Sequence, residues 1–411
     1  MRDVYVIGVG MTRFGKFPDK GLKSLAREAV EGALKHAGIE KSQLEVASVG
    51  NAYAGIATGQ ESIRGQVVLR AMGIGGLPVF NIENACASSA SGFMITWMDI
   101  ALGLHDVGLA MGMEKMYLED RDKRLALFSA SMDQEVLETF KKMAKKSAKD
   151  AAKKAGSKSE GASKRSLFMD VYAMATRWHM QKYGTTQRQL AVISSKNHNN
   201  SALNPYSQYQ KPMTVDEILS APEVSYPLTR PMCAPVGDGA AAAVLCSGDA
   251  LKRIGAEKPV KVRAVVQASG RDRGTEDTDI GEIMAEKAYE MAGLGPMDID
   301  VAEVHDATAF GELRALENMK FCPVGEGGPF SEAGNTALGG KIPVNPSGGL
   351  ESKGHPVGAT GVAQITEIVW QLRGEAGGRQ VEGARIGLAE NGGGNIGLEE
   401  AALNITILER V

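Results

Sequence analysis

The chain has 411 residues, which is too long for one ordinary hydrophobic core and suits two core domains, or a fused pair, with insertions. Hydrophobic residues at 43% and charged residues at 23% exclude a disordered or fibrous protein. The formal net charge is -3, so no overall positive field attracts nucleic acid, and local groups would have to bind any anionic ligand.

The first residues, MRDVYVIGVG, form an apolar run of strand length and carry no basic leader or cleavage site. No stretch reaches the roughly 18 apolar residues that a membrane span needs, so we expect neither export nor a membrane anchor. The four cysteines (Cys86, Cys233, Cys246 and Cys322) are scattered and form no CxxC pair. This pattern signals neither a zinc site nor a disulfide framework and favours reduced thiols in a cytoplasmic protein.

An internal duplication is the strongest organisational signal in the chain. The segment AREAVEGALKHAGIEKSQLEVASVGNA at 26–52 predicts an amphipathic helix that stops at Ala37-Gly38, followed by a short strand. The segment GEIMAEKAYEMAGLGPMDIDVAEVHDA at 281–307 repeats this pattern, with Ala292-Gly293 in register with Ala37-Gly38 at an offset of 255 residues.

Further strand candidates flank both repeats. VYVIGVG at 4–10 and VKVRAVVQASG at 260–270 open them, and VGLAMGMEK at 107–115 and RIGLAENGGG at 385–394 close them. Strands alternating with helices of ten or more residues, twice over, predict an α/β protein with two similar halves. A single Rossmann domain is disfavoured, because GVG at 8–10 lacks the third glycine and the downstream acidic residue of a dinucleotide fingerprint.

We expect four segments along the chain. Residues 1–113 and 228–258 form the N-terminal half, 114–227 form an insertion, and 259–411 form the C-terminal half. Within the insertion, 141–165 are rich in Lys, Ala and Ser. They suit either a solvated helix and loop or a lid whose lysines meet an anionic, phosphate-bearing ligand.

Cys86 is a candidate nucleophile. It lies in FNIENACASSASGFMITWMDIA, where a strand-like run gives way to small residues and then to an apolar helix. A turn into a helix N-terminus places free N–H groups near the sulfur, which lowers the pKa of a thiol and favours thiolate. On these residues alone, a buried inert cysteine is the competing interpretation.

Two histidines are candidate partners of this thiol. His355 lies between glycine-rich runs in NPSGGLESKGHPVGATGVAQITEIVWQL, and His305 opens HDATA directly after the predicted strand VAEV, at the strand end where open α/β sheets bind ligands. An imidazole can activate a nucleophile or hold a thioester oxygen. The other histidines have structural interpretations: His36, His105, His179 and His198.

These motifs resemble those of a known family. NPSGGLESKGHPVGATG closely resembles the C-terminal signature of thiolases of the sterol-carrier-protein type, and CASSASG resembles their nucleophile loop. HDATA resembles their His-Asp-Cys motif, and RPMCAPVGDGAAAAVLCS at 230–247 resembles the strand that closes their first half. The resemblance covers almost the whole chain. It implies a duplicated, five-layered α-β-α-β-α thiolase fold around two central helices, with the active site at the junction of the halves, and usually a dimer.

The resemblance also implies roles for matching residues. Cys86 would be acylated, His355 would activate it, and His305 with backbone amides would form an oxyanion hole. Coenzyme A would be a substrate, and no cofactor or metal would be bound. The remaining expected site residues shape the pocket or offer backbone N–H groups to an oxyanion: Asn345, Gly348, Gly349, Gly392, Gly393 and Gly394.

The sequence departs from this family at the second catalytic thiol, which acts as acid and base on the substrate α-carbon. Its two usual positions hold Ala307, third in HDATA, and Glu390, two residues before the triple glycine. Cys322 is offset from both and has a structural interpretation. We expect Glu390 to take over part of the acid/base role, since a dry pocket raises a carboxyl pKa toward neutrality. The alternative is a glutamate at the rim or at a dimer contact.

Three functions remain open at this point. The leading hypothesis is thiolytic cleavage of a specialised β-ketoacyl-CoA through an acyl-Cys86 intermediate. With its missing second thiol, the sequence resembles the catalytic subunit of two-subunit thiolases such as benzoylsuccinyl-CoA thiolase. This resemblance implies a small partner with a zinc ribbon and an OB-type barrel, and it makes 2-benzoylsuccinyl-CoA a candidate substrate. The alternatives are a retro-aldol lyase acting on a β-hydroxyacyl-CoA and a non-catalytic carrier of lipids or acyl-CoA.

Overall fold

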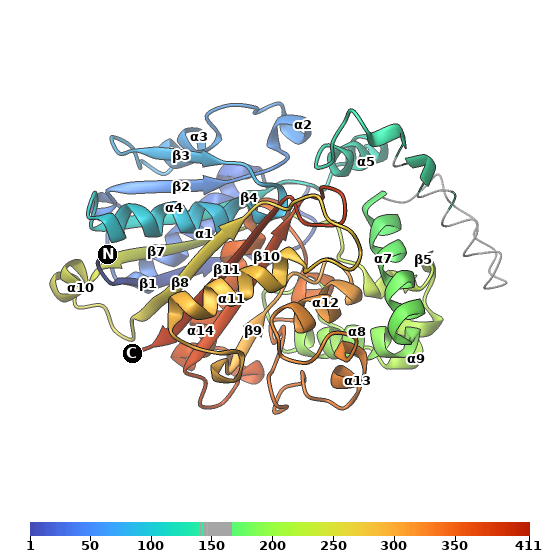
Figure 1. Ribbon diagram of the computed structural model, residues 1–411. Helices are drawn as coiled ribbons and strands as arrows, with labels where there is room; N and C mark the ends of the chain where they lie inside the picture. Colours follow the sequence, from blue (N-terminus) through green and yellow to red (C-terminus); the bar gives the residue numbers. More distant parts are fainter. Residues whose placement is uncertain (140, 144–145, 147–166) are drawn as a thin grey trace.

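The computed structural model describes residues 1–139, 141–143, 146 and 167–411, and Figure 1 shows their helices and strands. From the N-terminus to residue 254 the elements are β1 (Val4–Met11), α1 (Leu22–Ala37), β2 (Val46–Gly50), α2 (Ala54–Thr58), α3 (Arg64–Arg70), β3 (Val79–Ile82), α4 (Ser88–Leu102), β4 (Val107–Glu114), α5 (Arg121–Ser129), α7 (Leu167–Tyr183), α8 (Gln187–Ala202), α9 (Val215–Ser220), β5 (Glu223–Ser225), β6 (Leu228–Thr229), β7 (Gly239–Ser247) and α10 (Gly248–Ile254). The elements that follow are β8 (Val260–Ala268), α11 (Ile280–Ala292), β9 (Val301–Glu303), α12 (Ala309–Asn318), α13 (Gly327–Glu332), α14 (Thr360–Arg373), β10 (Ile386–Gly393) and β11 (Ala402–Arg410).

The two halves share one strand order, which confirms the predicted duplication. A nine-stranded sheet runs β3-β2-β4-β7-β1-β8-β11-β10-β9, and β1 and β8 join its halves. In each half the outer strands run parallel, and the last strand of the half returns antiparallel: β7 beside β4 and β1, and β11 beside β10 and β8. In the second half, a parallel bridge from Ala302 to Val344 takes the place of the pairing with β3. Ala302 lies 255 residues after Ala47, the residue of β2 that pairs with β3, so the offset of the duplication is kept.

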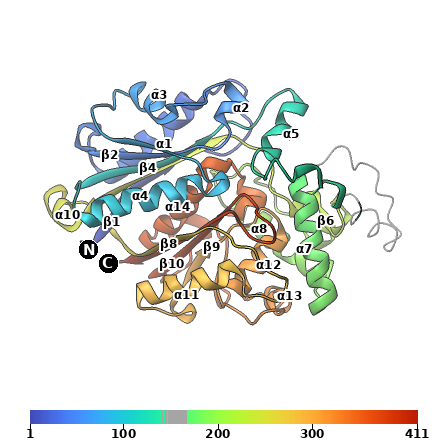
Figure 2. The ribbon, with the colours of Figure 1, turned by 45° about the horizontal axis from the view of Figure 1, so that its top comes forward.

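Helices cover both faces of each half of the sheet. Helices α4 and α14 contact each other, and α14 also contacts strands of both halves, so this pair forms the central layer. One outer core lies between α1, α3 and the first half, and another lies between α11, α12 and the second half. Figure 2 shows α4 and α14 side by side between the outer helices. The five-layered thiolase fold predicted from the sequence is confirmed.

The helix stops that revealed the duplication also have the same geometry. Helix α1 ends at Gly38 with φ of 67°, and α11 ends at Gly293 with φ of 66°. This left-handed conformation is favourable for glycine and closes the last helical turn. The apolar stripe of each helix is buried against its half of the sheet, as the 3.6-residue spacing of apolar residues predicts.

The glycines of GVG at 8–10 serve helix packing. A Cβ on Gly8 would lie 2.4 Å from the backbone nitrogen of Ala37, and one on Gly10 would lie 2.5 Å from the carbonyl oxygen of Ala29. Both contacts are too short for any side chain, so these glycines let α1 lie directly on β1. This role explains the motif without a nucleotide.

Helices α7 and α8 of the expected insertion pack on the second half, whereas α5 contacts α2 of the first half. Residues of α7, α8, β6 and α12 share one hydrophobic cluster, and Figure 1 shows these helices beside the strand ends. The lysine-rich stretch at 141–165 lies outside the described residues, apart from 141–143 and 146. Of the helices that the structure describes, none combines the length and apolarity required to cross a membrane.

Candidate active site

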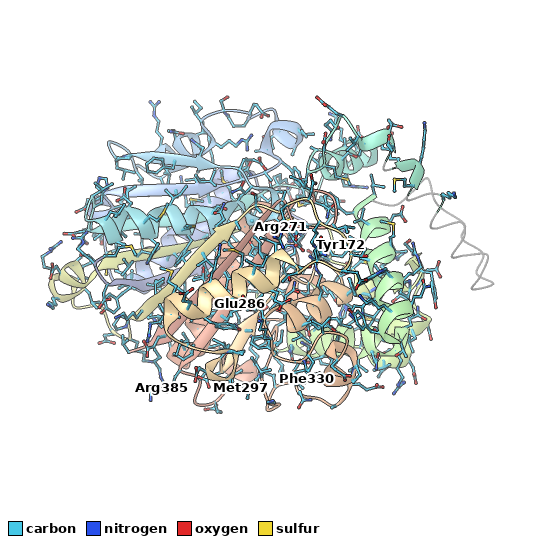
Figure 3. All side chains as sticks on the ribbon, in the orientation of Figure 1. Tyr172, Arg271, Glu286, Met297, Phe330 and Arg385 are labelled. Carbon is cyan, nitrogen blue, oxygen red and sulfur yellow. The ribbon has the colours of Figure 1, made fainter. Side chains whose placement is uncertain are left out.

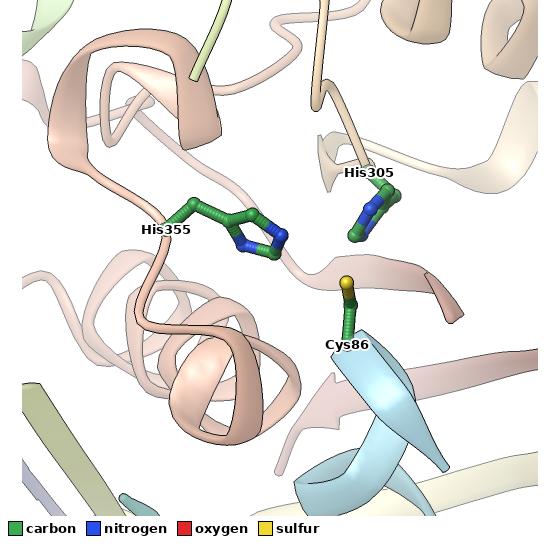
Figure 4. Close-up of side chains that lie close together, drawn as sticks. All are labelled: Cys86, His305 and His355. Atoms are coloured by element: carbon green, nitrogen blue, oxygen red, sulfur yellow. The ribbon is translucent and has the colours of Figure 1, made fainter. Parts of the chain in front are cut away.

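Three loops that are distant in sequence meet at one end of the sheet (Figure 4). Cys86 follows β3, His305 follows β9, and His355 follows the bridge at Val344. The parallel strands of each half have their carboxyl ends at this edge, which is where α/β sheets bind ligands. One donor atom from each of the three side chains lies within 4.8 Å of the others. The structure therefore brings together the three residues that the sequence motifs singled out.

The backbone turn around Cys86 is strained and tightly held. Residues Ala85–Ala87 form a short 3₁₀ turn before α4, and Ala85 has φ of 47°, a conformation that residues with a side chain rarely adopt. The hydroxyl of Ser88 donates to the carbonyl of Ala85 at 2.6 Å and accepts from the N–H of Asn84 at 3.0 Å. Such strain persists where the surrounding structure enforces it, commonly at functional sites.

The surroundings of Cys86 favour a neutral thiol. Burial raises the pKa of the Cys86 thiol to about 12, although the N–H groups of Gly394 and of Cys86 itself lower it and Glu114 raises it. The sequence analysis predicted a lowered pKa from the helix N-terminus, and that prediction was wrong. The loss of hydration destabilises the thiolate by more than the two N–H donors and the helix N-terminus stabilise it. The thiolate must therefore form by proton transfer to a nearby base.

His355 has the tautomer that such a base needs. Its Nδ1 lies 2.7 Å from the hydroxyl oxygen of Thr360, and that hydroxyl donates to the carbonyl of Pro356 at 3.1 Å. Because the hydroxyl has a single proton, Nδ1 of His355 must be the donor, and Nε2 is left with a free lone pair. Burial, with His305 and Lys353, holds the pKa of His355 well below its usual value, so the ring is neutral before reaction.

His305 has the complementary tautomer. Its Nδ1 accepts a hydrogen bond from the side-chain amide of Asn391 at 3.1 Å, which leaves the ring hydrogen on Nε2. Burial lowers the pKa of His305 to about 4. The rings of His305 and His355 lie 5.2 Å apart and are inclined by 81°. One neutral imidazole thus offers a base and the other an N–H donor, which is the pair that acyl transfer requires.

The triple glycine at the end of β10 lies against the Cys86 turn. Gly392, Gly393 and Gly394 all line the cavity in front of Cys86. A Cβ on Gly393 would lie 2.3 Å from the carbonyl oxygen of Asn84, so only glycine allows this approach. The N–H of Gly394 donates to the Cys86 sulfur. Fixed backbone donors at this point suit the oxyanion that forms when the sulfur attacks a carbonyl.

Asn345 supports the site without lining the cavity. Its side-chain oxygen accepts from the N–H of Val304 at 2.9 Å, and its side-chain nitrogen donates to Glu312 at 2.8 Å. The residue is fully buried. Because Val304 directly precedes His305, Asn345 fixes the position of this histidine through the backbone.

Gly348 and Gly349 also lie outside the cavity lining. A Cβ on Gly349 would lie 2.0 Å from a carboxylate oxygen of Asp306, and one on Gly348 would lie 2.4 Å from the Cβ of Ser201. Gly349 therefore lets the loop before His355 pack on the residue that follows His305, and Gly348 lets the same loop pack on α8.

Glu390 lies behind His305. Its side-chain oxygen accepts from the backbone N–H of His305 at 2.8 Å, and it borders a small cavity of about 20 Å³. Burial raises the pKa of Glu390 to about 8; the N–H of His305 opposes this shift and Glu400 adds to it. The structure thus places a carboxyl that titrates near neutrality next to His305, outside the lining of the main cavity.

Glu114, the last residue of β4, ties the loops of the two halves together. It is buried and accepts hydrogen bonds from the side chain of Asn51 at 2.9 Å, from the N–H groups of Ala52 and Tyr53 at 3.0 and 3.1 Å, and from the N–H of Gly358 at 3.0 Å. Burial raises the pKa of Glu114 to about 7, against these donors. Gly358 follows the His355 loop, so this carboxylate holds that loop in place relative to the first half.

The sequence analysis missed two residues that the fold brings to the cavity. His198, set aside as part of the insertion, lines it with Nε2 donating to the carbonyl of Pro231 at 3.2 Å and Nδ1 accepting from Ser352 at 3.1 Å. Tyr172 on α7 lines it as well. Neither residue belongs to a motif, so only the tertiary structure reveals their place.

The main cavity has a volume of about 780 Å³. Cys86, His305, His355 and Ala307 line it. Its wall includes apolar and aromatic side chains: Tyr53, Met116, Phe168, Met169, Tyr172, Met213, Val224, Pro231 and Val236. It also has four cationic side chains: Lys16, Arg124, Lys211 and Arg230. Within the described part of the chain, no ion pair joins these four cations to a carboxylate.

Two family models match the chain: the thiolase N-terminal domain over residues 4–225 and the thiolase C-terminal domain-like model over residues 275–406. An acetyl-CoA acetyltransferase of Methanothermobacter thermautotrophicus is 41% identical over 402 residues, covering 97% of this chain and 98% of the relative. Sterol carrier protein 2 of Homo sapiens is 36% identical, covering 95% of this chain and 70% of the relative.

Two further proteins are similar over nearly their whole lengths. The benzoylsuccinyl-CoA thiolase subunit BbsB of Thauera aromatica is 35% identical, covering 93% of this chain and 92% of the relative. A chain of the Ltp2-ChsH2(DUF35) aldolase structure superposes with a TM-score of 0.77 over 99% of this chain and 98% of its own, at 23% identity, which shows a shared fold. With the duplicated fold and the converging thiol and imidazoles, these matches show that the chain is a thiolase-type acyltransferase of the thiolase superfamily, in the branch that includes sterol carrier protein 2.

Proposed function

We propose that this enzyme cleaves a β-ketoacyl-CoA with coenzyme A through an intermediate in which the acyl group is bound to Cys86. The observation that carries the proposal is the set of three donor atoms, from Cys86, His305 and His355, within 4.8 Å of one another in the lining of a cavity of about 780 Å³. A nucleophile next to a base is the signature of covalent catalysis.

The tautomers suggest the order of events. Nε2 of His355 accepts the proton of Cys86, and the thiolate attacks the keto carbon. The N–H groups of Gly394 and Cys86 stabilise the oxyanion, and the bond between the keto carbon and the α-carbon then breaks. The leaving fragment is a thioester enolate, whose oxygen accepts a hydrogen bond from Nε2 of His305. Coenzyme A finally takes the acyl group from Cys86, and the sulfur regains its proton from His355.

The cations of the cavity support coenzyme A as the substrate. Lys16, Arg124, Lys211 and Arg230 line the wall and lack ion-pair partners among the described residues. Phosphates satisfy such groups through charge-assisted hydrogen bonds. We propose no bound cofactor or metal, although Cys86, His305 and His355 lie close enough together to hold a soft metal ion.

We propose a specialised acyl group rather than a plain acetyl unit. Ala307 occupies the position of the second thiol and lines the cavity, which leaves room beside the α-carbon for a substituent. The aromatic and apolar wall formed by Phe168, Met169 and Tyr172 suits a bulky acyl group. Since BbsB is 35% identical over most of both chains, 2-benzoylsuccinyl-CoA is our candidate substrate. Asn345, Gly348 and Gly349 act by positioning the histidine loops.

The test is a mass measurement with a panel of β-ketoacyl-CoA esters. Incubation without free coenzyme A is expected to add one acyl mass to the peptide that contains Cys86, and later addition of coenzyme A is expected to remove it. A retro-aldol lyase would instead release an aldehyde or ketone from a β-hydroxyacyl-CoA in the absence of coenzyme A. A lipid or acyl-CoA carrier would bind the esters without either change. Each of these two outcomes contradicts the proposal.

We also propose a homodimer core in the cytoplasm, with a small zinc-ribbon and OB-fold partner. Among the described strands, β3 (Val79–Ile82) pairs with β2 alone and stands at the edge of the sheet, and Phe80 on it is 41% exposed. A second copy can therefore pair with the outer side of this strand. The relative BbsB is named as a subunit. The segments 1–113 with 228–258, 114–227 and 259–411 remain our proposed division of the chain.

Purification from the native host is expected to yield this chain with a small zinc protein. Light scattering should give the mass of a dimer of this chain, and Phe80→Lys should shift it toward the monomer, because a buried lysine at a strand pair costs free energy. A fully active homodimer without a second polypeptide would contradict the partner proposal. A Phe80→Lys protein that stays dimeric would contradict the interface.

A further inference from the structure

Carbon–carbon cleavage leaves an enolate that must gain a proton at its α-carbon, and the two usual positions for the donor do not supply one at the cavity. Ala307 has no ionisable group. Glu390 borders the small cavity behind His305 and not the main cavity. A different group in the cavity wall must therefore deliver the proton, and the structure limits the choice.

Several candidates in the wall have their polar atoms engaged elsewhere. Both ring nitrogens of His198 are hydrogen-bonded. The hydroxyl of Tyr53 lies 2.6 Å from that of Ser131. The thiol of Cys233 points to the carbonyl of Thr229 at 3.5 Å. His355 takes the proton of the nucleophile, and His305 donates to the enolate oxygen.

Tyr172 has the geometry that these groups lack. It is carried by α7 and lines the main cavity together with Cys86, and it also lines the small cavity together with Glu390. Figure 3 shows Tyr172 between α7 and the strand ends. Its hydroxyl has no hydrogen-bond partner among the described residues. His305 and Glu400 also border both cavities.

Neither of those two can replace Tyr172 as a link. Both carboxyl oxygens of Glu400 accept hydrogen bonds from the guanidinium of Arg314, at 2.8 and 3.2 Å, so they are already engaged. His305 meets Glu390 only through its backbone N–H, which cannot carry a proton. The phenol of Tyr172 is the remaining group with an exchangeable proton that faces both spaces.

The small cavity itself suits a proton path. Its volume of about 20 Å³ is enough for one water molecule. Its lining includes polar groups of Glu390, Glu400, Arg314 and Asn318 besides Tyr172, which is more than the roughly two to four polar partners that a buried water requires. A water in this cavity would join the carboxyl of Glu390 to the phenol.

We propose that Tyr172 is a catalytic residue that delivers the proton to the α-carbon of the enolate and exchanges it with Glu390. The inference rests on the proposed thiolase reaction and deepens it. When the carbon–carbon bond breaks, the O–H bond of Tyr172 breaks and a C–H bond forms at the α-carbon. Glu390 returns a proton to the phenolate, and the thiol proton of the incoming coenzyme A restores Glu390 through Tyr172. No proton is gained or lost over the cycle.

The electrostatics are consistent with this role. Burial raises the pKa of Tyr172, with contributions from Glu400, Cys86 and Glu390 and an opposing one from Arg314. The phenol is therefore neutral before reaction and holds a proton to give. Arg314 is the cation that would stabilise the transient phenolate.

The test measures exchange of the α-protons of acetyl-CoA and succinyl-CoA with solvent deuterium, followed by mass spectrometry. This exchange reports enolate protonation and requires no acylation of the enzyme. We expect Tyr172→Phe to slow it about 100-fold, the usual range for a lost general acid. Tyr183→Phe, on the same helix but away from the cavity, should exchange at the wild-type rate.

Double variants separate a proton link from a packing effect. If Tyr172 and Glu390 act in one path, Glu390→Gln should slow exchange in the wild-type background and have little further effect in Tyr172→Phe. Exchange in Tyr172→Phe within about twofold of wild type would overturn the proposal, and so would independent effects of the two substitutions. The same comparison in a Cys86→Ala background distinguishes the role of Tyr172 from the proposed thiolase reaction. If exchange depends on Tyr172 but the wild type forms no acyl-Cys86, the thiolase proposal is contradicted and the role of Tyr172 as proton donor stands.

Discussion

Replacing Cys86 by serine is expected to abolish the acyl-enzyme and to lower the rate of thiolysis by at least about 1,000-fold, or about 4 kcal/mol of transition-state stabilisation. The hydroxyl of serine is a much weaker acid than a thiol, and the site does not favour anions, since burial, as the largest cause, raises the pKa of the Cys86 thiol to about 12. His355 is neutral and has a low pKa, so it would not deprotonate an alcohol to a useful extent.

The measurement pairs steady-state thiolysis with intact mass after incubation with a β-ketoacyl-CoA. Cys322→Ala is a matched control, because Cys322 lies in the outer core formed with α11 and α12 and does not line the cavity. The control should keep both the activity and the added mass. Full turnover in the Cys86→Ser protein would show that another group forms the bond to the acyl unit.

The duplicated fold could be predicted because its signals are local. The Ala-Gly stop recurs with an offset of 255 residues, and both Gly38 and Gly293 adopt the left-handed conformation that ends a helix. The continuous apolar strands around β4 and β7 likewise predict a sheet covered on both faces, and both strands are fully buried. The packing of α7 and α8 on α12 had no such signal, because it depends on contacts between residues more than 100 positions apart.

Part of the site was predictable because its signals, too, are local in the sequence. Cys86, His305 and His355 stand in distinctive short motifs, and the structure brings them together. The pKa of the thiol was not predictable, because desolvation depends on the cavity that the whole fold encloses. Tyr172 was not predictable either, since the sequence around it is an ordinary helix and only the tertiary structure places it between two cavities.

Replacing His355 by alanine is expected to slow acylation of Cys86 by about 100- to 10,000-fold at pH 7, the range for loss of a general base. The structure adds a pH signature. In the wild type, neutral His355 accepts the proton, so the rate should be nearly flat between pH 7 and 9. In the variant only the thiolate reacts, and because the pKa of Cys86 is raised to about 12, the thiolate fraction grows about tenfold for each pH unit below that value.

The measurement is the rate of acyl-Cys86 formation by rapid quench and mass spectrometry from pH 7 to 10. The variant should therefore approach the wild type as pH rises, whereas a variant damaged by misfolding would stay slow at every pH. His105→Ala is the matched control, since His105 contacts Asp99 at 2.8 Å, away from the cavity, and should keep the flat profile. A flat profile in His355→Ala at a rate within about tenfold of the wild type would mean that the thiol of Cys86 ionises without His355. The raised pKa of that thiol would then not govern the chemistry, and the base would have to be sought in His305 or in the substrate itself.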